Sequence, residues 1–149
     1  MVSDRGFAVR ALGEIVLRVR DPVGMRAFYE VDIGLPVLRH FPEERMTFFR
    51  VADGFAGHTT ILALFPESWP SNGADHAWRG RVSETTTLHH FALSIPLAEY
   101  PAALATLRAR GHQVATRTYP WIGWRSLYVR DPEDNVVELV CFDRSVLEA

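Results

Sequence analysis

The chain has 149 residues, of which 48% are hydrophobic and 23% are charged, a composition typical of one folded globular domain. Its 16 basic and 18 acidic residues are mixed along the chain and give a formal net charge of -2, so no basic run is present to bind a nucleic acid backbone. Cys141 is the only cysteine, which excludes an intramolecular disulfide and a cysteine-based zinc cluster and favours a reducing cytoplasm. Charged residues interrupt the N-terminus, and no later stretch reaches the roughly 20 apolar residues that a bilayer requires, so we expect neither an export signal nor a membrane span.

The first half of the chain predicts a strand, a helix and three more strands. Apolar and polar residues alternate from Glu14 to Arg20, which is the period of a strand with one buried face. A helix from about Pro22 to Val31 follows, because Asp21 is a suitable N-cap and Gly34 a suitable stop. Three short β-rich segments come next, separated by turn-forming residues, at 37–41, 46–52 and 59–65.

The second half repeats this order. Residues 88–95 alternate as a strand, and residues 97–110 predict a helix with Pro101 in its first turn and Gly111 at its end. Three more strands are expected at 113–118, 125–130 and 136–142. We therefore predict an α+β fold of two pseudo-repeated βαβββ modules within a single domain, residues 1–149. Module one spans about 12–65, a linker about 66–87 and module two about 88–143.

The hairpin around Asp131–Asn135 gives the sharpest structural prediction. With the turn centred near Glu133, antiparallel pairing sets Tyr128 opposite Glu138. The period of two then places Ser126 and Val140 on the same face as this pair. The alternate residues face the other way, into the core beneath the helices: Leu127, Val129, Val137 and Leu139.

Three segments resemble the vicinal oxygen chelate superfamily, which contains glyoxalase I, bleomycin resistance proteins and extradiol dioxygenases. The segment Ser126–Glu138, with its Asp131-Pro132 turn, is similar to the signature ending of the superfamily, although Asp134 stands where a glycine is usual. Residues 89–95 resemble the strand that opens the second module, and residues 14–22 resemble the opening of the first. The resemblance implies a cupped mixed β-sheet with a divalent metal site.

The same resemblance implies three metal ligands, Glu14, His90 and Glu138. Ala63 occupies a fourth ligand position of glyoxalase I and has no donor, so the set is similar to the three-ligand site of extradiol dioxygenases, with Glu14 in place of a histidine. One imidazole and two carboxylates suit Fe(II), Mn(II), Zn(II) or Ni(II), and the residues do not distinguish among these metals. A structural, hydrogen-bonded role for His90 and a surface role for Glu14 stay open as alternatives.

The resemblance also implies roles around the metal. Tyr128 matches an extradiol tyrosine, and Tyr128 and Glu138 are the predicted catalytic residues. Arg18 and Trp124 are the predicted substrate-binding residues, the arginine for an anionic group and the indole as a pocket wall. Two further residues are assigned away from the site: Arg125 to a structural role, and His58 to the surface unless a bulge turns it toward the missing ligand position.

The leading functional hypothesis is a metal-dependent enzyme that acts on a small oxygenated, catechol-like metabolite. Ring-cleaving dioxygenation is the first choice, and isomerase or lyase chemistry is the second. The alternative is a non-catalytic drug-binding protein of the bleomycin resistance type, and a purely structural interaction module is a third reading. We expect a small molecule as the binding partner. We also expect a homodimer, because an apolar surface with Phe48, Phe49, Trp121 and Trp124 would be costly to leave exposed.

Overall fold

The computed structural model describes residues 9–69 and 88–148, and these two ranges form two compact units. Each unit holds one four-stranded mixed sheet with helical segments against it. The chain thus has the expected α+β fold of two repeated βαβββ modules. Most of the linker predicted at 66–87 lies outside the described residues. None of the helices in the described part of the chain is long and apolar enough to cross a membrane.

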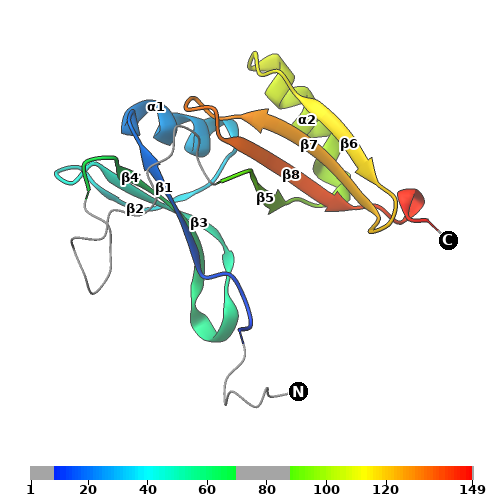
Figure 1. Ribbon diagram of the computed structural model, residues 1–149, viewed down its shortest axis with the longest axis horizontal. Helices are drawn as coiled ribbons and strands as arrows, with labels where there is room; N and C mark the ends of the chain where they lie inside the picture. The colour runs from blue at the N-terminus through cyan, green and yellow to red at the C-terminus, as the bar shows by residue number, and fades with distance from the viewer. Residues whose placement is uncertain (1–8, 70–87, 149) are drawn as a thin grey trace. The chain divides into compact units, whose positions relative to one another are not determined.

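The first unit contains a sheet with the strand order β1-β4-β3-β2 (Figure 1). β1 pairs with β4 in parallel, and the other two pairings are antiparallel. The strands are β1 (Glu14–Val19), β2 (Val37–Phe41), β3 (Met46–Asp53) and β4 (Thr59–Pro66). Leu17 and Val19 are buried as their alternation predicts. The alternate residues of β1, Glu14, Val16 and Arg18, therefore face away from this core.

The predicted helix of the first unit has two parts. Asp21 caps α1 (Pro22–Ala27) by accepting a 3.0 Å hydrogen bond from the backbone nitrogen of Gly24. A π-helical turn, η1 (Phe28–Asp32), continues it, and the chain turns away at Gly34 with a φ of 82°. η1 buries Tyr29 against Phe49 of β3, with ring centroids 6.1 Å apart. The expectation that Phe49 lies on an exposed apolar surface is therefore wrong, because its side chain points to the helix.

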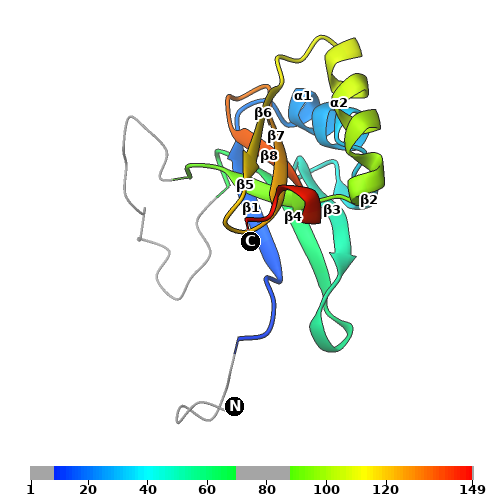
Figure 2. The ribbon, with the colours of Figure 1, turned by 90° about the vertical axis from the view of Figure 1, so that its right-hand side faces the viewer.

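The second unit has the strand order β5-β8-β7-β6, with α2 along one face of the sheet (Figure 2). β5 and β8 are parallel, and the other pairs are antiparallel. The elements are β5 (Phe91–Ser94), α2 (Tyr100–Ala109), β6 (Ala115–Tyr119), β7 (Trp124–Arg130) and β8 (Val136–Phe142). A short 3₁₀ turn, Leu97–Glu99, precedes α2 and takes the first part of the predicted helix. β5 is shorter than predicted, so His90 lies just before the strand.

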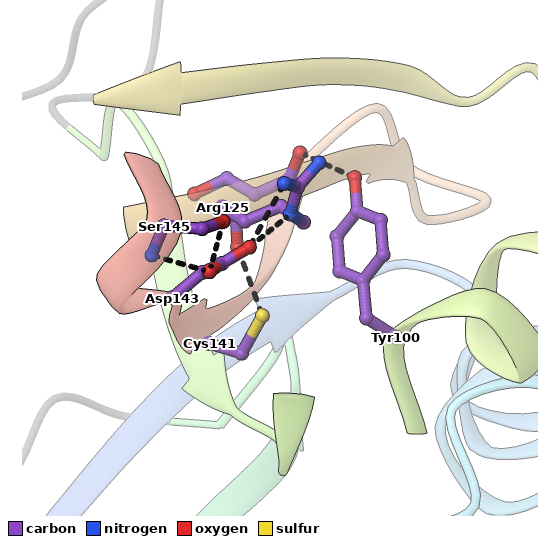
Figure 3. A network of polar contacts seen from close by, with 6 residues as sticks. Tyr100, Arg125, Cys141, Asp143 and Ser145 are labelled. Atoms are coloured by element: carbon purple, nitrogen blue, oxygen red, sulfur yellow. Dashed lines mark hydrogen bonds and ion pairs between the residues drawn. The ribbon is translucent and has the colours of Figure 1, made fainter. Parts of the chain in front are cut away.

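The face of this sheet that contacts α2 carries a polar network (Figure 3). Arg125 donates to Asp143 through Nε at 2.9 Å and lies 2.8 Å from it through Nη2. Hydrogen bonds from Ser145 and then the Arg125 guanidinium hold the pKa of Asp143 below its usual range. Burial raises the pKa of the neighbouring Cys141 thiol, which is free. The guanidinium carbon also lies 5.8 Å from the ring of Tyr100 on α2. Arg125 of β7 therefore binds the C-terminal segment through Asp143. This contact is consistent with the structural role that the sequence predicts for Arg125.

Candidate functional site

The β7–β8 hairpin is closed by the side chain of Asp131. Its Oδ1 accepts hydrogen bonds from the backbone nitrogens of Glu133 and Asn135, both at 2.9 Å, and Oδ2 accepts from the Asn135 amide at 2.8 Å. Asp134 adopts a φ of 65°, in the left-handed region that favours glycine, which explains why glycine is usual there. This turn sets the register in which Tyr128 pairs with Glu138, as the sequence predicts.

Glu138 is the centre of the site, because two polar side chains converge on its buried carboxylate. The residue is 3% exposed. Tyr128 donates its hydroxyl hydrogen to Oε1 at 3.2 Å, and His90 Nε2 lies 3.2 Å from Oε2. Ala92 pairs with Glu138 in the parallel β5–β8 ladder, and His90 precedes Ala92 by two residues, so strand alternation brings the imidazole to the same face.

Tyr128 is held by a second phenol that the sequence analysis does not identify. The hydroxyls of Tyr119 and Tyr128 are hydrogen-bonded, and since Tyr128 gives its hydrogen to Glu138, Tyr119 is the donor in this contact. Burial, the hydrogen bond to Tyr119 and the charge of Glu138 together raise the pKa of Tyr128 well above its usual value. Tyr128 is thus a hydrogen-bond donor at neutral pH.

The pair His90 and Glu138 has the spacing of two ligands of one cation. Two donor atoms bound at a right angle, with metal bonds of about 2.1 Å, lie about 3.0 Å apart. The observed separation of His90 Nε2 and Glu138 Oε2 is 3.2 Å. The other ring nitrogen of His90 contacts Nδ1 of His89 at 2.6 Å, which orients the imidazole with Nε2 toward the carboxylate. This separation suits two ligands of one cation and equally a direct hydrogen bond between His90 and Glu138. Within the described ranges, no three His, Cys, Asp or Glu side chains cluster.

The face of the first sheet opposite α1 carries the predicted residues Glu14 and Arg18, both exposed on β1. Ala63 lies on this face, paired with Val16 of β1 and Phe48 of β3, and is fully buried. It supplies no donor atom. Glu14 belongs to the first unit, and the pair His90–Glu138 belongs to the second.

An aromatic row extends over this same face of the first unit. Consecutive ring centroids lie 5.8, 5.6 and 6.4 Å apart along Phe41, Phe48, Phe65 and Trp69. The guanidinium of Arg39 lies 4.9 Å from the Phe41 centroid. Such a row offers flat apolar contacts beside a cation, which suits an aromatic ligand with a negative group.

The remaining predicted residues occupy distinct positions. Trp124 is 36% exposed on the Tyr128 face of β7, where it pairs with Phe142 and Tyr119. His58 is exposed and follows a 3₁₀ turn, with its ring packed close to Gly13, whose added Cβ would lie 3.1 Å from His58 Cε1. It is thus a surface histidine beside the start of β1.

Ser126 is a second residue whose role the sequence does not reveal. It lies between Trp124 and Tyr128 on the same face of β7, is fully buried, and its hydroxyl has no hydrogen-bond partner among the described residues. The β6–β7 register pairs Ser126 with Arg117. These two residues lie between the strand positions of Tyr119 and Tyr128, whose hydroxyls are hydrogen-bonded. Strand alternation predicts that Ser126 lies on this face, but it does not show that the hydroxyl is unpaired.

The sequence model of the Glyoxalase/Bleomycin resistance protein/Dioxygenase superfamily matches residues 11–139. No curated protein matches the chain.

Solved structures with the same fold include proteins with assigned functions. A lactoylglutathione lyase from Agrobacterium tumefaciens is 27% identical, with a TM-score of 0.63 over 87% of this chain and 92% of that one. A mutant of the fosfomycin resistance protein FosX from Listeria monocytogenes, complexed with Mn(II) and 1S,2S-dihydroxypropylphosphonic acid, is 18% identical, with a TM-score of 0.62 over 93% and 95%. An integron cassette protein from the mobile metagenome of a Halifax Harbour sewage outfall is 18% identical, with a TM-score of 0.66 over 90% and 100%.

Proposed function

Because the chain belongs to the Glyoxalase/Bleomycin resistance protein/Dioxygenase superfamily, we propose that it is a metal-dependent enzyme for a small oxygenated, catechol-like metabolite. Ring-cleaving dioxygenation is the first choice of reaction, and isomerase or lyase chemistry is the second. The observation that carries the proposal is the convergence of His90 Nε2 and the Tyr128 hydroxyl on the buried carboxylate of Glu138. Buried polar clusters of this kind concentrate at functional sites.

His90 and Glu138 would hold the metal. Only the resemblance to the superfamily supports Glu14 as a third ligand. A bound divalent cation would supply Lewis acidity for two neighbouring substrate oxygens. The Mn(II) in the FosX complex supports including Mn(II) among the metals to be tried, beside Fe(II), Zn(II) and Ni(II).

The protein groups around the metal would bind and orient the substrate. Tyr128 would turn its single hydroxyl hydrogen from Glu138 to a substrate oxygen, and the hydrogen bond from Tyr119 would hold the Tyr128 oxygen in place. Arg18 receives an anionic group, and Trp124 packs against the apolar part of the ligand.

The proposal is tested by metal binding. Protein purified without chelators is analysed by mass spectrometry for metal, and its thermal midpoint is measured with and without Fe(II), Mn(II), Zn(II) and Ni(II). Glu138→Gln keeps the shape of the side chain but removes the charge, so we expect metal-dependent stabilisation in the parent and none in this variant. Glu148→Gln, at an exposed glutamate, serves as the control and should behave like the parent. Equal midpoints for parent and Glu138→Gln under every condition would sink the metal assignment.

A non-catalytic drug-binding protein is the second candidate. The fully buried Ala63 at a predicted ligand position favours it, since this residue leaves the site one donor short of glyoxalase I. This function requires thermal stabilisation by an aromatic drug without added metal, and no oxygen consumption with catechol as the probe. Metal-dependent oxygen consumption would exclude it in favour of the enzyme.

We place the protein in the cytoplasm as a homodimer. The single, free cysteine supports a reducing compartment. The exposed apolar side chains of Trp121, Phe142 and Leu147, at 72%, 57% and 42% exposure, support self-association of the second unit.

A further inference from the structure

The first unit contains a cavity of about 440 Å³ that lies apart from the proposed active-site face. It is bounded by α1, η1 and the turn between β2 and β3, and His40 on its wall pairs with the buried Thr47. Thr47 lies two residues from Phe49, which packs under Tyr29, so the cavity opens on the helix side of the sheet. The aromatic row lies on the opposite side.

Most of the cavity wall is apolar. Two of its residues are unusually exposed valines, Val23 at 76% and Val31 at 56%. Both side chains lie on the cavity wall, where they are open to a ligand. The apolar wall is completed by Pro22, Ala27 and Pro42.

The polar groups of the cavity include one arginine, Arg45, that is exposed and follows Glu43 and Glu44 in the turn. Arg26 is neutralised by Glu30, with Nε and Oε2 2.9 Å apart. His40 contacts Thr47 Oγ1 through Nδ1 at 2.9 Å, which leaves Nε2 for another partner. Arg45 forms no ion pair with any residue that the structure describes.

Arg45 also has a backbone conformation that is unfavourable for residues other than glycine. Its φ is 56°, in the left-handed region where glycine is the usual residue. Strain of this kind clusters at ligand-binding positions, where a particular side chain is needed in spite of its backbone cost. Arg45 thus combines this backbone conformation with a position on the cavity wall.

We propose that this cavity binds a small amphipathic carboxylate, the size of a medium-chain fatty acid or an aromatic acid. The hydrocarbon part contacts Val23, Ala27 and Val31, and the carboxylate pairs with Arg45 and accepts a hydrogen bond from His40 Nε2. A cavity of this volume is within the range of small-molecule sites, about 300–1,000 Å³. The site is independent of the metal-dependent function, since it shares no residue with it.

The test uses the full chain and sodium octanoate, followed by nuclear magnetic resonance at constant ionic strength. Saturable shifts at the amides of Val23, Ala27 and Val31 are expected, with at least tenfold weaker binding of the neutral 1-octanol. Octyltrimethylammonium, which reverses the charge, should not shift these amides. Equal binding of octanoate and octanol, or octanoate shifts located on the aromatic row instead, would overturn the proposal.

Arg45→Gly separates binding from folding. It removes both the guanidinium and the backbone strain, so octanoate binding should weaken at least tenfold while the thermal midpoint stays equal or rises. Arg108→Gln removes the same charge from exposed α2 and should bind octanoate as the parent does. Ala27→Trp fills the cavity at an exposed helix position and should abolish binding without lowering the midpoint. Unchanged octanoate affinity in Arg45→Gly or Ala27→Trp would place the ligand elsewhere.

Discussion

Replacing Ser126 by alanine should stabilise the protein, although the residue lies in the middle of β7. The side chain is fully buried, and its hydroxyl has no hydrogen-bond partner among the residues that the structure describes. An unpaired buried hydroxyl costs about 1–3 kcal/mol, and alanine removes that cost while leaving only a small gap. We expect Ser126→Ala to raise the free energy of unfolding by about 1–2 kcal/mol, and for a chain of this length the thermal midpoint rises by roughly 2–8 °C.

The assay is urea and thermal unfolding followed by circular dichroism. Ser94→Ala is the matched control, because Ser94 is exposed on β5 and pairs with Val140, the residue that pairs with Ser126 on its other side. This control should change stability by less than about 0.5 kcal/mol. The dependence of the unfolding free energy on urea should be unchanged in both variants.

Two results would refute this reasoning. A loss of stability in Ser126→Ala would show that the hydroxyl has a partner, such as a bound water. A gain of the same size in Ser94→Ala would show that alanine itself, rather than the removal of a buried hydroxyl, stabilises this sheet.

The remaining predictions concern the turn, the C-terminal segment and self-association. Asp134→Val should lose about 1–2 kcal/mol in urea unfolding, because a β-branched residue disfavours positive φ, while Asp134→Gly should be close to neutral; equal stability of the two variants would contradict the turn geometry. The pKa of Asp143 is lowered, so its stabilisation is present above about pH 4 and is lost as pH falls through the folded pKa. The thermal midpoint of Asp143→Asn should therefore lie below that of the parent at pH 7 and converge with it in acid; a constant difference down to pH 2 would count against this linkage. Light scattering at micromolar concentration should show a dimer that Trp121→Lys weakens, and a monomeric parent would exclude this interface.

Much of the strand structure is predictable from local sequence. β2 and β8 begin and end at the predicted residues, because turn-forming residues bound each apolar run. The pairing of Tyr128 with Glu138 is also predicted, since the Asp131–Asn135 turn sets the register of a short hairpin. The resemblance implies Glu138 as a metal ligand, and the register predicts only that it shares a face with Tyr128. The structure gives the contacts of its carboxylate with His90 and Tyr128.

The helices are less predictable than the strands. The first splits into α1 and the π-helical turn η1, and the second begins at Tyr100 after a 3₁₀ turn. Small differences in backbone hydrogen bonding separate these helical forms, and apolar periodicity does not distinguish them.

The sequence by itself determined the order of the elements and which side chains share a strand face, because alternation is a local property of the chain. Only the tertiary structure decided which face of the first sheet its helix covers. Phe49 is buried because Tyr29 packs on it, a contact between residues twenty positions apart. The hydrogen bond from Tyr119 to Tyr128 and the unpaired hydroxyl of Ser126 likewise depend on where side chains from different strands meet. Such contacts depend on how distant segments pack together, and the periodicity of a single segment does not predict that packing.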